Sequence, residues 1–198
     1  GTEFYFSIAA GPMHWVIMAS YLRDGVWTKP EAVDFPGPYS AVDMAFSTDG
    51  QRLYYCSNRP AAGTGEASET ADIWYVERTA DGWSEPINLG PPINSEHHEF
   101  YPSLTVDGTL YFQSRRPGGP GSGDIYRSRL IEGEYRQAEL LPEPINIEDF
   151  EGEGTRADYR LDAALELGTS APFGLTLEAG VSGTDYQDTT DAELVDIE

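Results

Sequence analysis

Apolar and polar residues alternate in short stretches of this chain, and the same order of stretches occurs twice. Residues 53–92 and 110–144 both give a short aromatic strand, an Arg-Pro corner, a Gly-rich loop and an Asp-Ile-aromatic strand, and both lead to a Pro-Ile-Asn exit. Strand-like alternation with tight turns is widespread, whereas no long stretch shows helical periodicity. The pattern predicts an all-β protein.

The repeat has a period of about 50 residues, which in a β-rich chain indicates propeller blades. Residues 41–90 and 99–146 are two full four-stranded repeats, each with an Asp-Gly hairpin turn. Residues 1–34 match only the last three strands of a repeat, expected at 4–8, 16–21 and 26–33. We therefore expect about two and a half blades within residues 1–150, an incomplete propeller with open blade edges. Such edges favour self-association.

The last part of the chain, residues 151–198, follows a different pattern. It holds 12 acidic residues against two arginines, a net charge of −10. Apolar residues alternate over 159–167 and again over 173–181, which predicts an acidic amphipathic β-hairpin. Three interpretations stay open: a cover for an exposed blade face, an origin in an outer-membrane barrel, or a disordered tail.

The charge of −22 excludes several classes of partner. Lys29 is the only lysine, so no basic face for nucleic acid or an anionic membrane can form. No apolar run approaches the roughly 18 residues of a membrane helix, and we expect no membrane insertion. The chain begins without the basic start of a signal peptide. Cys56 is the only cysteine, which excludes a disulfide framework and a Cys-based metal site.

An arginine and an aspartate recur at matching positions of the two full repeats. They are Arg59 with Asp72 and Arg116 with Asp124, and the partial repeat carries apolar residues at both positions. Joint loss is expected of side chains that pair, because removing one partner would strand a buried charge. We predict a structural Arg–carboxylate bridge within each repeat, with no catalytic role.

Candidate chemistry is sparse elsewhere. His97 and Glu99 are the closest approach to a metal site, but neighbouring strand residues point to opposite faces and no further ligand is evident. The Gly-rich stretch 118–123 is interpreted as a hairpin loop, because an Asp that opens a strand follows it in place of the Lys and helix of a phosphate loop. No nucleophile, base and orienting residue occur together. We expect a protein that is not an enzyme and needs no cofactor, with Ca²⁺ as the one alternative that acidic loops would suit.

The repeat resembles a known family, the WD-like, TolB-type β-propeller repeat of bacterial envelope proteins. The resemblance covers roughly residues 1–150 and is carried by Ser57-Asn58-Arg59-Pro60, Asp72-Ile73-Trp74, the stretch 82–90, Arg116-Pro117-Gly118-Gly119 and Asp124-Ile125-Tyr126. It implies a periplasmic or extracellular, non-catalytic binding or scaffold module with a protein or peptide partner. The alternatives are the propeller portion of a hydrolase or peptidase without its catalytic domain, and a propeller that binds Ca²⁺ or sugar.

Overall fold

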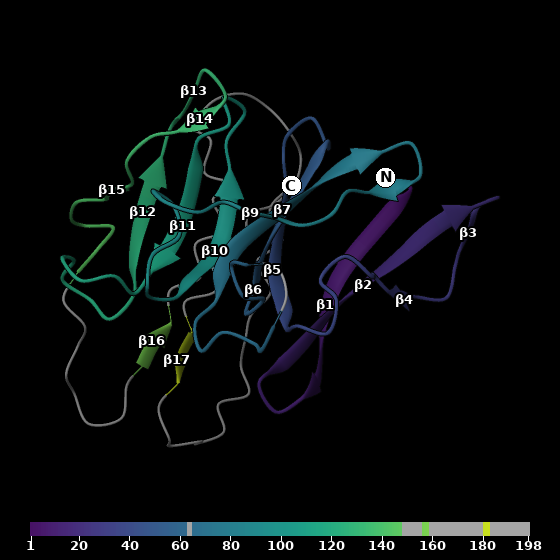
Figure 1. Ribbon diagram of the computed structural model, residues 1–198, viewed down its shortest axis with the longest axis horizontal. Coiled ribbons are helices and arrows are strands. Elements are labelled where there is room, and N and C mark those ends of the chain that lie inside the picture. Colours follow the sequence, from purple (N-terminus) through teal and green to yellow (C-terminus); the bar gives the residue numbers. More distant parts are fainter. Residues whose placement is uncertain (63–64, 148–155, 159–179, 183–198) are drawn as a thin grey trace, which may run out of the picture.

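The computed structural model describes residues 1–62, 65–147, 156–158 and 180–182. Its regular elements are β-strands in antiparallel pairs, and these residues contain no helix (Figure 1). The all-β prediction is therefore confirmed.

Three sheets lie side by side in chain order (Figure 1). The first sheet contains β1 (Glu3–Gly11), β2 (His14–Arg23), β3 (Val26–Trp27) and β4 (Glu31–Ala32). The second sheet contains β5 (Ala41–Phe46), β6 (Arg52–Ser57), β7 (Asp72–Thr79), β8 (Gly82–Trp83) and β9 (Ile87–Asn88). The third sheet contains β10 (Glu99–Leu104), β11 (Leu110–Ser114), β12 (Asp124–Ser128) and β15 (Glu139–Leu140).

Two further pairs of short strands complete the described elements. They are β13 (Leu130–Ile131) with β14 (Glu134–Tyr135), and β16 (Arg156–Asp158) with β17 (Gly180–Ser182). The hairpin predicted for 159–181 lies outside the described residues except at its end, where β16 and β17 pair in antiparallel fashion.

The last strand of each repeat is divided, in contrast to the prediction. The stretch 26–33 forms the two short strands β3 and β4, which pair with different parts of β2. Pro30 lies between them, and proline has no N–H to donate to a sheet. Pro86 separates β8 from β9 in the second sheet in the same way.

The second and third sheets repeat the same hairpin and bulge. Asp43 in β5 (φ 54°) and Tyr101 in β10 (φ 52°) lie where the register with the next strand shifts. At the turn that follows, the Asp49 carboxylate accepts from the Ser47 hydroxyl at 2.6 Å and from the backbone N–H of Gln51 at 2.9 Å. The next repeat makes both contacts with Asp107.

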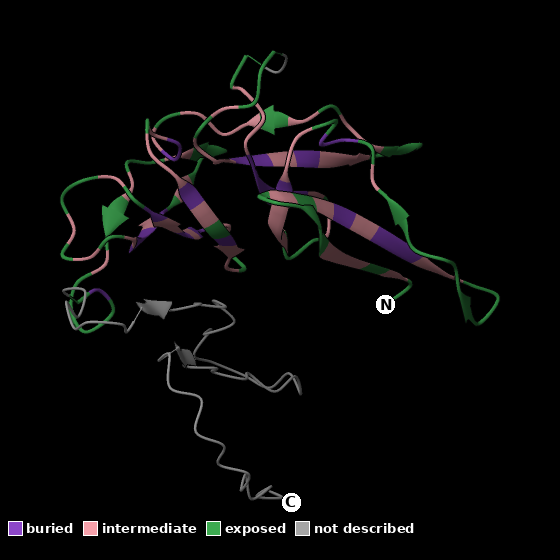
Figure 2. Cartoon of the chain, turned by 90° about the horizontal axis from the view of Figure 1, so that it is seen from below, coloured by how far each residue is buried: buried purple, intermediate pink, exposed green. Residues whose placement is uncertain are grey.

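Alternate side chains of β6 point to opposite faces of the second sheet and contribute to two separate hydrophobic cores. Leu53 and Tyr55 point to a cluster shared with the first sheet, whereas Tyr54 and Cys56 point to a cluster shared with the third. These residues are all buried, and Figure 2 shows buried positions within the strands and exposed ones along the loops. The second sheet is thus covered on both faces.

The first sheet starts one strand later than the other two. In chain order β1 corresponds to β6 and β11, which pair on their other side with β5 and β10. No strand pairs with that side of β1 among the described residues, so β1 is an edge strand. The described sheets do not close into a propeller.

Candidate functional site

Arg116 lies in a dense network at the end of β11. Its guanidinium forms an ion pair with the Glu99 carboxylate at 3.2 Å, and Nε donates to the Ser114 hydroxyl at 2.8 Å. It also donates to the backbone carbonyls of Pro92 and Ile93 in the preceding loop. Arg116 therefore ties the connection between the second and third sheets to the third sheet.

The Glu99 carboxylate is completely buried in this network. It accepts from the Ser114 hydroxyl at 2.8 Å, and from the hydroxyl and backbone N–H of Ser95 at 2.6 and 3.0 Å. A buried charge is tolerated when it is paired and hydrogen-bonded in this way. Glu99 thus carries a structural charge, although the sequence drew attention to it only as a metal ligand.

The other predicted arginine, Arg59, has a different environment. It donates to the Phe35 carbonyl at 3.3 Å and packs over the rings of Tyr39 and Trp74. Arg59 Nε is buried and has no hydrogen-bond partner. Ala41 occupies the start of β5, where the third sheet has Glu99, so this arginine lacks the corresponding carboxylate.

The predicted bridge between Arg59 and Asp72 is not found among the ion pairs of the described residues. The Asp72 carboxylate instead accepts from the Asn88 side chain at 2.8 Å, and burial raises its pKa. Asp124 is buried at the start of β12 and accepts from the backbone N–H of Gly121, which closes the Gly-rich loop. The Asp72 carboxylate thus has a neutral donor within its own repeat, and the Asp124 carboxylate accepts at least one backbone N–H within its own.

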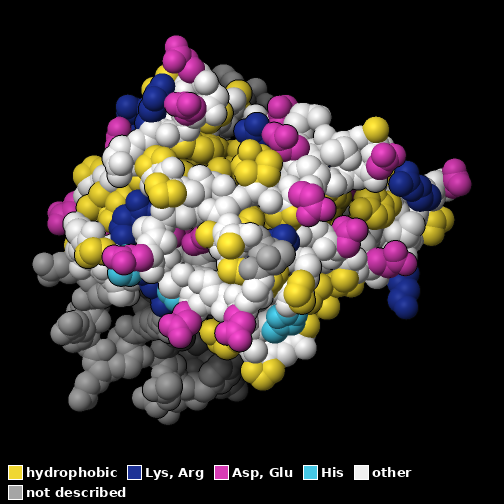
Figure 3. Space-filling view, viewed as in Figure 1, with side chains coloured by type: hydrophobic (Ala, Val, Ile, Leu, Met, Phe, Trp, Pro, Cys, Tyr) yellow, Lys and Arg dark blue, Asp and Glu magenta, His cyan; other side chains and the backbone are white. Residues whose placement is uncertain are grey.

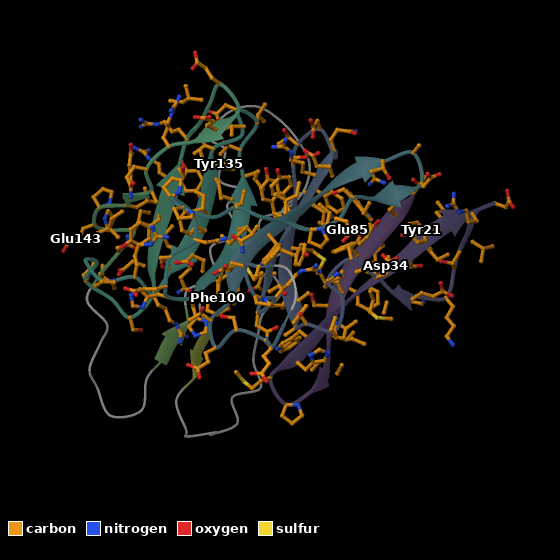
Figure 4. The ribbon with its side chains drawn as sticks, viewed as in Figure 1. Tyr21, Asp34, Glu85, Phe100, Tyr135 and Glu143 are labelled. Carbon is orange, nitrogen blue, oxygen red and sulfur yellow. The ribbon has the colours of Figure 1, made fainter. Side chains whose placement is uncertain are left out.

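His97 and His98 directly precede β10, which carries Phe100 at the end of the third sheet opposite Tyr135 (Figure 4). His98 Nδ1 accepts from the backbone N–H of Ala71 at 3.1 Å, and its ring stacks on Phe100. Burial, together with Arg115, lowers the pKa of His98, so neutral imidazole is favoured. Within the described part of the chain, no group of three or more His, Cys, Asp or Glu side chains is arranged to hold a metal ion.

Two asparagines of the repeated Pro-Ile-Asn motif each form two hydrogen bonds to the backbone of one residue, and we call this arrangement a clamp. Asn94 accepts from the backbone N–H of Ile73 at 2.8 Å and donates to its carbonyl at 2.9 Å. Asn146 makes the same two bonds to Ile125 at the same distances. The spacing of 21 residues in both repeats is the signal that could have identified the clamps.

The first sheet has an apolar face that no described residue covers. Tyr5 and Ile17 point toward the second sheet, so their neighbours along the strands point the other way. Phe4 lies 5.5 Å from Phe6 and 6.4 Å from Trp27 between ring centroids. Phe4 is 56% exposed, Trp27 47% and Ile8 41%. We call Phe4, Phe6, Ile8 and Trp27 the outward face.

Charged and apolar side chains are interspersed over the molecular face in Figure 3, and no large patch of one sign stands out there. The described residues offer no helix that could cross a membrane. No protein-family model matches the chain, and no match was found among curated proteins. The candidate site is the open edge of β1 together with the outward face beside it.

Proposed function

We propose that this chain is a non-catalytic binding or scaffold module built of propeller-type blades, which takes up an extended segment of a partner protein at β1. The observation that carries the proposal is the open edge of β1 beside the outward face. The resemblance of the repeats to those of bacterial envelope proteins supports, as part of the proposal, a location in the periplasm or outside the cell. No described strand occupies this edge.

The hydrogen-bond pattern identifies which backbone groups of β1 are available. The N–H of Leu22 donates to the carbonyl of Thr2 at 2.8 Å, so Thr2 and Leu22 form a hydrogen-bonded pair. Such pairs alternate along an antiparallel ladder, so Phe4, Phe6 and Ile8 bond to β2. The backbone groups of the intervening residues, including Tyr5 and Ser7, point to the open side.

The partner is an extended strand because the other two sheets carry one at this place. β5 pairs with β6, and β10 pairs with β11, on the side that is open in β1. Strand addition of this kind obtains affinity from main-chain hydrogen bonds and specificity from side chains on alternate positions. The outward face supplies the apolar surface for those side chains, and no proline or lysine within β1 blocks pairing.

The first prediction is that β1 binds a peptide with the sequence of a first strand. The probe is a fluorescein-labelled peptide of residues 40–47, which contains β5, and binding is followed by fluorescence anisotropy. We expect saturable binding to the chain. Ser7→Pro should weaken binding at least about tenfold, because it removes one N–H from the open edge but none that bonds to β2.

Ser7→Ala is the matched control. The Ser7 hydroxyl is buried without a hydrogen-bond partner, so its removal should leave both folding and binding unchanged. Circular dichroism and thermal unfolding establish that both variants are folded. Absence of saturable binding to the unaltered chain, or equal binding by folded Ser7→Pro, would overturn the proposed edge.

A further inference from the structure

Three buried donors belong to neighbouring residues on the face of the second sheet that packs against the first. They are the hydroxyl of Tyr55, Nε of Arg59 and Nε1 of Trp74, and none of them has a hydrogen-bond partner among the residues that the structure describes. Tyr55 and Trp74 are directly paired across β6 and β7, so their side chains share one face of the sheet. The Arg59 guanidinium lies 5.5 Å from the Trp74 ring.

Phe35 contacts two of these three residues. The Phe35 ring packs on Tyr55 at 5.3 Å between centroids, and the Phe35 carbonyl accepts from Arg59. Tyr55 is completely buried and Trp74 is 2% exposed. Burial raises the pKa of Tyr55, so its hydroxyl stays protonated and can donate. A buried donor without an acceptor costs free energy. Here one of the three donors, Arg59 Nε, also belongs to a cation, which adds a charge without a counter-charge beside it among the described residues.

The next repeat shows what balances the same arrangement. Arg116 stands where Arg59 stands, and each donates to a backbone carbonyl 24 residues upstream. Around Arg116 the Glu99 carboxylate supplies the acceptor, and Nε is satisfied through Ser114. Around Arg59 the corresponding residue is Ala41, which has no acceptor.

The aromatic residues beside the two arginines also differ between the second and third sheets. Phe112 stands in the third sheet where Tyr55 stands in the second, and Tyr126 stands where Trp74 stands. The repeat that lacks the carboxylate thus carries a hydroxyl in place of a phenyl hydrogen, and an indole N–H. It has lost the carboxylate acceptor and gained one donor, since Tyr126 already carries a hydroxyl where Trp74 carries its N–H.

We propose that Arg59, Tyr55 and Trp74 form a binding site for a carboxylate group, which takes the part that Glu99 plays beside Arg116. Arginine with two neutral donors suits a carboxylate, because charge-assisted hydrogen bonds are the stronger ones in a water-poor site. Two sources can supply the group: a free small carboxylate, or an acidic side chain of a partner peptide. The half-buried Arg59 marks the side from which the group enters.

The test uses the full chain labelled with ¹⁵N and follows the indole N–H signal of Trp74, assigned with a Trp74→Phe variant. Acetate is titrated against chloride at equal ionic strength. We expect a saturable downfield shift with acetate and none with chloride. The indole of Trp83 is the internal control, since its N–H already donates to the Tyr5 hydroxyl at 3.2 Å and should not respond.

Two variants sharpen the result. Arg59→Gln should weaken acetate binding at least tenfold. Ala41→Glu supplies the carboxylate from the chain itself, so the Trp74 signal should move without acetate and stop responding to it. If Ala41→Glu does not fold, the titration of the unaltered chain and of Arg59→Gln still decides.

A blocked aspartate, N-acetyl-aspartate methylamide, distinguishes the two sources. A stronger response to it than to acetate assigns the site to a peptide side chain, and a response to acetate alone assigns it to a free carboxylate. No response to either compound would overturn the proposal, because buried water would then satisfy the donors. An equal response to chloride would overturn the assignment to a carboxylate.

Discussion

Arg116 and Glu99 show how one buried charge can organise a junction between sheets. Glu99 is fully buried and Arg116 is 15% exposed, whereas Arg127 and Glu139 form an ion pair with exposures of 34% and 48%. Breaking a buried pair leaves an uncompensated charge, and an exposed pair is screened by solvent. The two pairs should therefore differ in their contribution to stability.

At this scale we predict that Glu99→Ala or Arg116→Ala alone lowers the free energy of unfolding by about 3–5 kcal/mol. The double variant should lose less than the sum, because it leaves neither charge unpaired. Arg127→Ala, in the exposed pair, is the control and should cost about 0–1 kcal/mol. Urea unfolding gives all four values, provided that the transition is two-state. Additive losses at Glu99 and Arg116 would contradict the network.

The sequence predicted the recurring arginines but not their partners. Arg59 and Arg116 recur because each fixes the loop that enters its repeat. The aspartates recur at matching positions as well, and the repeat pattern therefore predicted them as the partners of the arginines. Glu99 was considered only as a metal ligand and not as the partner of an arginine, because Ala41 replaces it in the other repeat and a residue that occurs once leaves no repeating signal.

At the scale of the strand, the asparagine clamps fix the start of β7 and the start of β12. Asn146 donates to the carbonyls of Ile125 and Leu141 and accepts from the N–H of Ile125. Asn146 and Ile125 are both buried, so these bonds satisfy backbone groups that water does not reach. The clamp joins the end of the third repeat to the start of β12.

Asn146→Leu should lower the free energy of unfolding by about 2–4 kcal/mol, because it leaves at least two buried backbone groups unsatisfied. Gln113→Ala is the comparison, since Gln113 makes one bond to the Gly123 carbonyl at 3.2 Å and is only half-buried. It should cost about 1 kcal/mol or less. Equal losses in thermal or urea unfolding would mean that Asn146 is not a clamp.

The strands themselves were predictable from alternation and turn residues. The division of a repeat's last strand into two short strands was not. β5 to β7 and β10 to β12 follow the expected order around Asp-Gly turns. In the first two sheets the final strand divides at a proline, Pro30 or Pro86, because one missing donor is enough to interrupt so short a ladder. The clamps join residues 21 positions apart, a distance that periodicity within one strand does not report.

For the whole molecule, the repeat explains both the covered and the open surfaces. The second sheet has neighbours on both faces, and its two core clusters are separated by the alternation along β6. Among the described residues, the first sheet has a neighbour on one face only, and β1 has a partner strand on one side only. An edge strand with an exposed apolar face is a template for pairing with another chain.

The measurement that tests this account most directly is amide hydrogen exchange of β1, with and without the peptide of residues 40–47. In the free chain, the amides of Tyr5 and Ser7 should exchange much faster than those of Tyr54 and Cys56, which face β5 at the matching positions of β6. Bound peptide should slow Tyr5 and Ser7 by at least about tenfold. Equal protection of the four amides in the free chain, or no slowing by saturating peptide, would contradict the account.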